Sequence, residues 1–244
     1  MTHFRLIKRL AVNALRGHNT NVRAIVFHPK ATIFLDKKDV NLASCAVNGS
    51  VKLWSLESDE PVADIEGHKA RVARVIWHPS RRFLGTTCYD HSWRLWDLEA
   101  QVEFLHEEGH SKGVYDIAFH VDCSLSATGS LDEFGRLWDL RTGHCIMFLE
   151  GHLKEICGIN FSPNGYHIAT GSGDNFLRQR KCIYTIPAHQ NLVTGVKFEP
   201  NHGNFLLESQ CGQVGKVMGL DISMDGQLIA TCSYDRTFKL WMAE

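Results

Sequence analysis

Histidine, aspartate and tryptophan, three residue types that often do chemistry, recur in this chain at fixed spacing. Asp90 follows His68 by 22 residues and precedes Trp96 by 6, and the same two intervals recur from His110. A His beside an Asp and a hydroxyl group is how many hydrolases activate a nucleophile. A catalytic set is needed only once, whereas this one returns in unit after unit. We therefore interpret it as a structural hydrogen-bond network, in which a His ring joins a turn Asp to a strand Ser or Thr that also accepts from the indole N–H.

The network is predicted in each unit that keeps this spacing. Asn48 stands where other units have the Asp, and Gln213 stands where the last unit should have its His. Removing one member of such a network costs roughly 1–3 kcal/mol, because its buried partners lose their hydrogen bonds. The residues assigned to the network are His18, Trp54, His68, Asp90, Trp96, His110, Asp132, Trp138, His152, Asp174, Asp235 and Trp241.

The elements that must position these side chains are the strands of a repeating unit. Gly-His pairs end at residues 18, 68, 110 and 152, with Ala188-His189 as a variant, so that the intervals are 50, 42, 42 and 37 residues. A period near 42 is typical of a four-stranded β-propeller blade. The sequence therefore predicts an all-β propeller of six units, preceded by a tail at 1–8 and a strand at 9–16. The units are placed at 17–66, 67–107, 109–149, 151–187, 188–211 and 212–244.

The propeller is expected to be incomplete, because two units are shorter than the others. The unit at 151–187 reads FLRQRKCIYTIPAH where a third strand ending in Trp-Asp should stand, so we expect that strand to be missing. The unit at 188–211 supplies only two strands. The last unit ends after its third strand, and an unpaired strand edge invites aggregation. We expect the strand at 9–16 to pair with Phe238–Trp241 and join the two ends of the chain.

Composition and cysteine usage argue against several classes of function. A net charge of −1 gives the chain no bulk attraction for nucleic acid or anionic lipid. None of the eight Cys residues forms a C-x-x-C pair. Cys45, Cys88 and Cys232 are assigned to one buried slot of the small-residue strand, as free thiols. No apolar run is long enough to span a membrane, and the N-terminus lacks a signal-peptide core, so we expect an intracellular protein. We expect no catalytic residues, no cofactor, no metal site and no membrane partner.

A second set of residues is predicted to face partners rather than the core. Positions just after each Gly-His pair, or beside the turn Asp, should lie at one end of the ring. Tyr and Arg are favoured contact residues at protein interfaces. The alternative is that these are ordinary solvated loop residues. The candidate partner surface consists of Arg23, Arg71, Tyr89, Tyr115, Glu155, Asn191 and Tyr234.

The units resemble WD repeats, with Gly-His near the start and Trp96-Asp97, Trp138-Asp139 and a variant Trp54-Ser55 near the end. Longer segments, including GSVKLWSLESDEPVADIEGH and GQLIATCSYDRTFKLWMAE, are similar to the WD-repeat proteins of the U4/U6 small nuclear ribonucleoprotein, a family of pre-mRNA splicing factors. The similarity covers nearly everything after about residue 14.

This resemblance implies a non-enzymatic scaffold of the U4/U6 and U4/U6·U5 particles in the nucleus. Its implied partners are splicing proteins of the U4/U6 particle, a cyclophilin and the U4/U6 RNA. Family members have seven blades and a long N-terminal region, so the resemblance implies the RNA and cyclophilin contacts only where they do not depend on that region. The alternatives are a generic WD-repeat adaptor such as a ubiquitin-ligase substrate receptor, a non-functional shortened copy, and a direct nucleic-acid binder.

Overall fold

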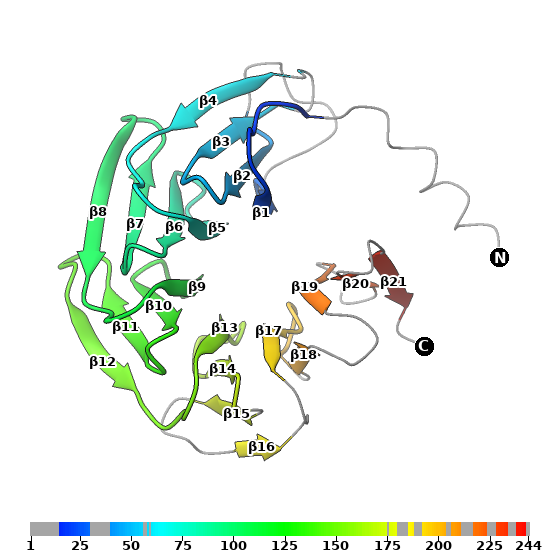
Figure 1. Ribbon diagram of the computed structural model, residues 1–244. Coiled ribbons are helices and arrows are strands. Elements are labelled where there is room, and N and C mark those ends of the chain that lie inside the picture. The colour runs from blue at the N-terminus through cyan, green and yellow to red at the C-terminus, as the bar shows by residue number, and fades with distance from the viewer. Residues whose placement is uncertain are drawn as a thin grey trace.

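The described strands form six separate antiparallel sheets, which confirms an all-β, incomplete propeller. Figure 1 shows the sheets arranged as blades around a common axis, with β1, β5, β9, β13, β17 and β19 nearest the axis. The computed structural model describes residues 15–29, 40–55, 58, 60–174, 176–179, 185–187, 192–203, 206–210, 217–223, 228–233 and 238–242.

Each blade is a meander whose strands run in sequence order from the axis outward. Blade 1 consists of β1 (Val22–Phe27), β2 (Leu42–Ala46), β3 (Val51–Trp54) and β4 (Pro61–Ile65), and blade 2 of β5 (Val72–Trp77), β6 (Phe83–Cys88), β7 (Ser92–Asp97) and β8 (Val102–Glu108). Blade 3 consists of β9 (Val114–Phe119), β10 (Leu125–Ser130), β11 (Gly135–Asp139) and β12 (Cys145–Leu149), and blade 4 of β13 (Ile156–Phe161), β14 (Ile168–Ser172), β15 (Phe176–Gln179) and β16 (Thr185–Pro187). Blade 5 consists of β17 (Val193–Phe198) and β18 (Leu206–Gln210), and blade 6 of β19 (Val217–Ile222), β20 (Leu228–Ser233) and β21 (Phe238–Met242).

The fourth blade corrects the expectation that its third strand is missing. β15 pairs with β14 and in turn with β16, so this sheet has four strands. The register joins Gly171 to Leu177 and Phe176 to Pro187. Strand pairing is made by backbone N–H and C=O groups, which Phe176–Gln179 supplies without a Trp. The absence of Trp-Asp was therefore a wrong indicator that the strand itself was absent.

The second strand of each blade is rich in small residues because the next blade packs directly against it. A Cβ on Gly85 would lie 2.6 Å from the Phe119 ring, and a Cβ on Gly129 would lie 2.7 Å from Cγ2 of Ile156. Contacts this short are sterically forbidden, so the packing between blades requires glycine there. Ala43 and Cys45 of β2 likewise pack with β5 of blade 2 in one buried cluster.

The turn between the second and third strands is an Asx turn that repeats along the chain. The side-chain oxygen of Asp90 accepts the backbone N–H of Ser92, and Asp132 accepts that of Phe134 in the same way. The residue after the acceptor has positive φ: 91° at Gly49, 75° at His91 and 78° at Glu133. An Asx turn stabilises this conformation locally and fixes the direction of the carboxylate.

The predicted closure of the ring falls largely outside the described residues. Of the predicted strand at 9–16, only residues 15 and 16 are described, and they are not in a strand. Among the described strands, β21 pairs with β20 alone. Figure 1 shows that the arc of described strands is open between β1 and blade 6.

Candidate partner-binding face and the blade network

Blade 3 contains the predicted network in full. Nδ1 of His110 lies 2.9 Å from the Asp132 carboxylate, and Nε2 lies 2.8 Å from the Thr128 hydroxyl oxygen. The Trp138 indole N–H donates to the same hydroxyl at 2.8 Å, and the Ser111 backbone N–H donates to the carboxylate at 2.9 Å. A carboxylate can only accept, so Nδ1 carries the proton and Nε2 accepts from Thr128. Each polar side chain of this buried network thus has at least one hydrogen-bond partner.

The electrostatics of Asp132 follow from this geometry. Burial by itself would raise the pKa of the carboxyl group, but the hydrogen bond and charge interaction with His110, together with the Ser111 and Phe134 backbone N–H groups, lower it below its ordinary value. The carboxylate therefore stays ionised while only 3% of its side chain is exposed. Hydrogen bonding to the charged form dominates over desolvation here.

Blade 4 repeats the His–Asp–Thr part of the network. Nδ1 of His152 lies 3.0 Å from Asp174, and Nε2 lies 2.9 Å from Thr170. The sequence has Arg180 at the position of the Trp, and this residue lies outside the described part of the chain. The three-membered core of the network therefore forms in a blade whose sequence does not keep the Trp.

Blade 1 forms an equivalent network with one additional hydroxyl group. His18 Nε2 lies 2.6 Å from the Ser44 hydroxyl oxygen, to which the Trp54 indole N–H donates at 2.7 Å. Nδ1 lies 2.9 Å from the Ser50 hydroxyl oxygen, which donates to Oδ1 of Asn48 at 2.8 Å. Ser50 therefore bridges the His to the Asn that replaces the Asp.

Blade 2 has the same residues, but its His–Asp contact is open. His68 Nε2 and the Trp96 indole N–H both meet the Thr86 hydroxyl, at 2.8 and 2.9 Å. Nδ1 of His68, however, lies 4.0 Å from the Asp90 carboxylate, beyond hydrogen-bond distance, and has no hydrogen-bond partner among the described residues. Burial lowers the pKa of His68 from its ordinary value.

Asp90 has other partners within its own blade. The Arg94 guanidinium lies 3.4 Å from the Asp90 carboxylate and also donates to Glu103 and to the Gly67 carbonyl oxygen. The other carboxylate oxygen of Asp90 accepts from the Ser92 backbone N–H and hydroxyl. Asp90 is therefore held by its own turn and by Arg94 rather than by the His.

In blade 6 the structure does not describe the predicted network. Asp235 lies outside the described residues, and Trp241 is placed only as a backbone position of β21. That Asp235 and Trp241 belong to a further copy of the network stays a prediction.

The candidate partner surface brings four of its residues together at the edge where the inner strands begin. The Arg71 guanidinium donates to the Tyr89 hydroxyl at 2.8 Å and stacks on that ring, with 4.2 Å from the guanidinium carbon to the ring centroid. Arg23 of β1 reaches the Tyr115 hydroxyl of β9 at 3.5 Å. Burial raises the pKa of Tyr115, so its phenol stays protonated at neutral pH. This Arg–Tyr face joins blades 1, 2 and 3.

A backbone hydrogen bond repeated in four blades places these residues at equivalent positions. In each case the residue after the second strand donates its N–H to the carbonyl oxygen just before the inner strand. The pairs, donor first, are Val47 and Asn21, Tyr89 and Arg71, Leu131 and Gly113, and Gly173 and Glu155. Glu155 of blade 4 therefore occupies the position of Arg71 in blade 2. Asn191 and Tyr234 lie outside the described residues.

A clamp across three blades, Arg74–Asp116–Ile159, was missed in the sequence. Arg74 of β5 donates to Asp116 of β9 at 2.8 Å, and the other carboxylate oxygen of Asp116 accepts the Ile159 backbone N–H of β13 at 3.0 Å. Arg74 and Asp116 stand 42 residues apart, at the same position of successive units. Opposite charges at one repeat position in otherwise apolar strands were the signal that could have predicted this pair.

Comparison with known proteins identifies the repeat. The family model described as WD domain, G-beta repeat, matches residues 9–55, 59–97, 102–139, 143–179 and 204–242. The chain belongs to the WD40 family.

The WD40 chain also matches curated proteins over most of its own length. It is 75% identical over 257 aligned residues, or 96% of this chain, to the protein named U4/U6 small nuclear ribonucleoprotein Prp4 in Bos taurus, and equally so to that of Homo sapiens. A Saccharomyces cerevisiae protein named U4/U6 small nuclear ribonucleoprotein PRP4 is 33% identical over 83 residues, 32% of this chain and 16% of the yeast protein. The chain spans about half, 49%, of the length of the mammalian relatives.

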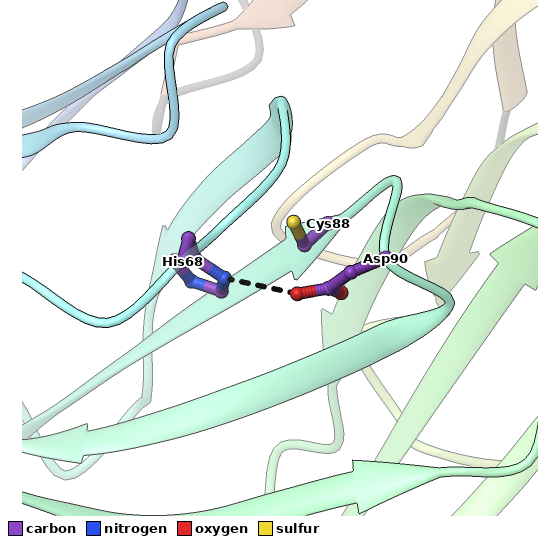
Figure 2. A group of neighbouring side chains, drawn as sticks. All are labelled: His68, Cys88 and Asp90. Carbon is purple, nitrogen blue, oxygen red and sulfur yellow. Dashed lines mark ion pairs between the residues drawn. The ribbon is translucent and has the colours of Figure 1, made fainter.

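One group in this WD40 chain has residue types that could ligate a metal. Figure 2 shows His68, Cys88 and Asp90 converging at the end of β6, and their ligand atoms lie within 4.8 Å of one another. Burial raises the pKa of the Cys88 thiol to about 11, and its S–H donates to the Ala70 carbonyl oxygen at 3.4 Å. Arg94 already pairs with Asp90. A protonated thiol and a resident guanidinium both oppose a metal cation, so the surroundings favour a hydrogen-bonded turn, and the absence of a metal site stays a prediction.

The cysteines of the WD40 repeats are free thiols in the described residues, but they do not share one slot. The register pairs Ala24 with Cys45 and Gly219 with Cys232, whereas Cys88 pairs with Val72, one position farther along. Cys45 and Cys88 are buried and Cys232 is exposed, so the expected common buried slot was wrong for both Cys88 and Cys232.

A membrane-spanning helix is not found in the described part of the chain, where no helix has the necessary length and hydropathy.

Proposed function

We propose that this chain is a non-enzymatic scaffold of the U4/U6 and U4/U6·U5 small nuclear ribonucleoprotein particles in the nucleus, where it binds splicing proteins of the U4/U6 particle. The observation that carries the proposal is its 75% identity, over 96% of its length, to proteins named as U4/U6 particle components. A cyclophilin and the U4/U6 RNA are further proposed partners.

The Arg–Tyr face is the proposed docking site for the protein partner. Arg71 is held by both a hydrogen bond and ring stacking against Tyr89, so the pair is ordered before a partner arrives. Stacked Arg and Tyr side chains offer cationic donors and aromatic area together, the combination enriched at binding hot spots. Glu155 at the equivalent position of blade 4 places a negative charge on the same edge, which would orient the partner.

Affinity purification of the tagged chain from nuclear extract tests the proposal. We expect U4 and U6 RNA and their proteins to co-purify, and we expect Arg71→Glu to reduce their recovery at least about tenfold, as for a hot-spot residue worth more than 1.4 kcal/mol. Arg141→Glu is the matched control, because this guanidinium is 85% exposed in a turn of blade 3, away from the Arg–Tyr face.

Other results of the same purification identify the alternatives. A soluble chain that melts cooperatively and recovers no particle component would overturn the proposal. Ligase subunits in place of particle components would indicate an adaptor for ubiquitination. Binding of a hydrophobic dye with no cooperative melt would indicate a non-functional shortened copy.

A further inference from the structure

The inner strand of blade 1 has an apolar face that the described residues leave uncovered. Val22, Ile25 and Phe27 of β1 are 51, 59 and 61% exposed. Exposed apolar groups that line up on one strand face mark an interaction site more often than scattered ones do.

The same three repeat positions are buried in the blades that follow. Val22, Ile25 and Phe27 of β1 have the same register against β2 that three residues of β5 have against β6. The equivalent residues of β5 are Val72, Val75 and Trp77. These blade 2 residues are 0, 1 and 8% exposed. They are covered because Ala43 and Cys45 of the preceding blade pack against them. The β1 face is therefore one half of a blade-to-blade contact.

The other half lies at the opposite end of the arc, where the described residues also leave it uncovered. The small residues that receive the next blade, such as Gly129 and Gly171, correspond to Cys232 of β20, while Ala230 lies two positions earlier on the same strand face. Ala127 and Ala169, the equivalents of Ala230, are fully buried, whereas Ala230 is only half-buried and Cys232 is exposed. Leu228 on the same strand face is 42% exposed.

We propose that a second copy of this chain binds end to end, with Val22, Ile25 and Phe27 of one copy packed on Leu228, Ala230 and Cys232 of the other. The two faces carry the residue types that meet between consecutive blades within the molecule, where a Cβ on Gly171 would lie 2.6 Å from Val193 and from Val196 of the next blade. Figure 1 places the two faces on opposite sides of the opening, so each copy keeps one free face after the first contact. Such a contact is heterologous and can extend beyond a dimer.

Sedimentation velocity of the full chain measures this association directly. We expect the average mass to rise with concentration over about 1–100 µM, a range suited to an interface of one sheet face. Ile25→Glu and Ala230→Glu should each raise the dissociation constant at least about tenfold. Ile146→Glu is the matched control, because Ile146 is 53% exposed on the outer strand β12, away from both ends. A chain that stays monomeric throughout, or an Ile25→Glu variant that associates as the unmodified chain does, overturns the proposal.

Mixing the two variants tests the direction of the contact. Each variant keeps one intact face, so an equimolar mixture should form a dimer that stops at two copies. A contact between two β1 faces would instead let the Ala230→Glu variant self-associate on its own, and this result would contradict the end-to-end arrangement.

A cross-link gives a second measurement that does not depend on introducing a charge. Val22→Cys places a thiol opposite Cys232, by analogy with the packing of Val193 against Gly171. Mild oxidation should give a disulfide-linked species of two or more chains on a non-reducing gel, absent from a Val22→Cys/Cys232→Ser variant. A link formed within a single chain would show that the ring closes on itself and would overturn the proposal.

Discussion

Blades 2 and 3 are copies of one repeat, and they hold the same His–Asp–Thr–Trp set in two states. In blade 3 the His110–Asp132 contact is a 2.9 Å hydrogen bond, whereas in blade 2 the His68–Asp90 contact is 4.0 Å long. The Thr–Trp half is unchanged, with indole-to-hydroxyl distances of 2.8 and 2.9 Å. Both blades have an Arg at the same repeat position, but Arg94 pairs with Asp90, whereas Arg136 stacks on the Phe148 ring. The strand half of the network is therefore the same in the two blades, and the turn half differs with the partners that surround the carboxylate.

The largest difference between the two blades is expected at a packing position. Gly129 of blade 3 corresponds to Thr87 of blade 2, and a Cβ on Gly129 would lie 2.7 Å from Ile156. Gly129→Thr, which copies blade 2 into blade 3, should lower the free energy of unfolding by about 3 kcal/mol through overpacking. The reverse change, Thr87→Gly, should cost about 1 kcal/mol from backbone entropy and lost side-chain contact. Urea denaturation measures both, and equal costs would contradict the steric explanation.

The second difference is expected at the carboxylates. Asp132→Asn should lower the free energy of unfolding by about 2 kcal/mol, because it weakens a charge-assisted hydrogen bond to a buried His. Asp90→Asn should cost at most about 1 kcal/mol, because the His68 contact is already open and the side-chain amide can still accept from Ser92. Thermal unfolding of the two variants, with matched buffers, gives the ranking. A larger loss for Asp90→Asn would show that the Arg94 pair contributes more than the closed network does.

The His of blade 2 and the Asp of blade 3 should respond to acid in different pH ranges. Burial lowers the pKa of His68 in the folded state, so the unfolded chain binds a proton first and stability is lost as the pH falls below about 6.5. The pKa of Asp132 is lowered in the folded state, so its contribution is complete above about pH 4 and is lost only in stronger acid. His68→Asn should remove about 1 kcal/mol of the stability loss between pH 7 and pH 5.5. His144→Asn, at an exposed position, is the control, and an identical pH slope in both variants would contradict the prediction.

The smallest effect is expected at Cys88. Its S–H donates to the Ala70 carbonyl oxygen, and at the equivalent position of blade 3 the Ser130 hydroxyl donates to Gly113 at 3.0 Å. Cys88→Ser should therefore change the free energy of unfolding by less than about 0.5 kcal/mol. Calorimetry with and without added Zn²⁺ checks this. A stabilisation by Zn²⁺ that Cys88→Ser abolishes would instead indicate a metal site at the end of β6.

The repeat made much of this architecture predictable, because the fixed spacing of His, Asp and Trp places the turns at the same positions in each unit that keeps it. The incomplete all-β propeller was predicted on this basis, and the two units that keep both intervals contain the four-stranded sheets β5–β8 and β9–β12. β15 was missed, because its pairing depends on the backbone of β14 rather than on a Trp. Arg74–Asp116 was missed for a related reason: a side-chain pair between blades depends on which repeat positions meet between neighbouring inner strands, which a single unit does not reveal.

The open His68–Asp90 contact could not be predicted from the residue spacing either. Both residues stand at the repeat positions, and blades 2 and 3 even share the Arg four residues after the Asp; Arg94 pairs with Asp90, whereas Arg136 stacks on the Phe148 ring. Lys52 occupies that repeat position in blade 1 and pairs with Asp64 of the outer strand instead. Which carboxylate a cation selects depends on side-chain geometry, and residue type alone does not decide it.

The Arg74–Asp116–Ile159 clamp should make blades 2, 3 and 4 open together. Repeat proteins fray from their ends when each unit contacts only its neighbours. Here one buried carboxylate is bonded on both sides, so opening blade 2, 3 or 4 leaves Asp116 without one of its partners. Amide hydrogens of these three blades should consequently exchange with solvent together, as one cooperative unit, while the sheets at either end of the arc exchange earlier.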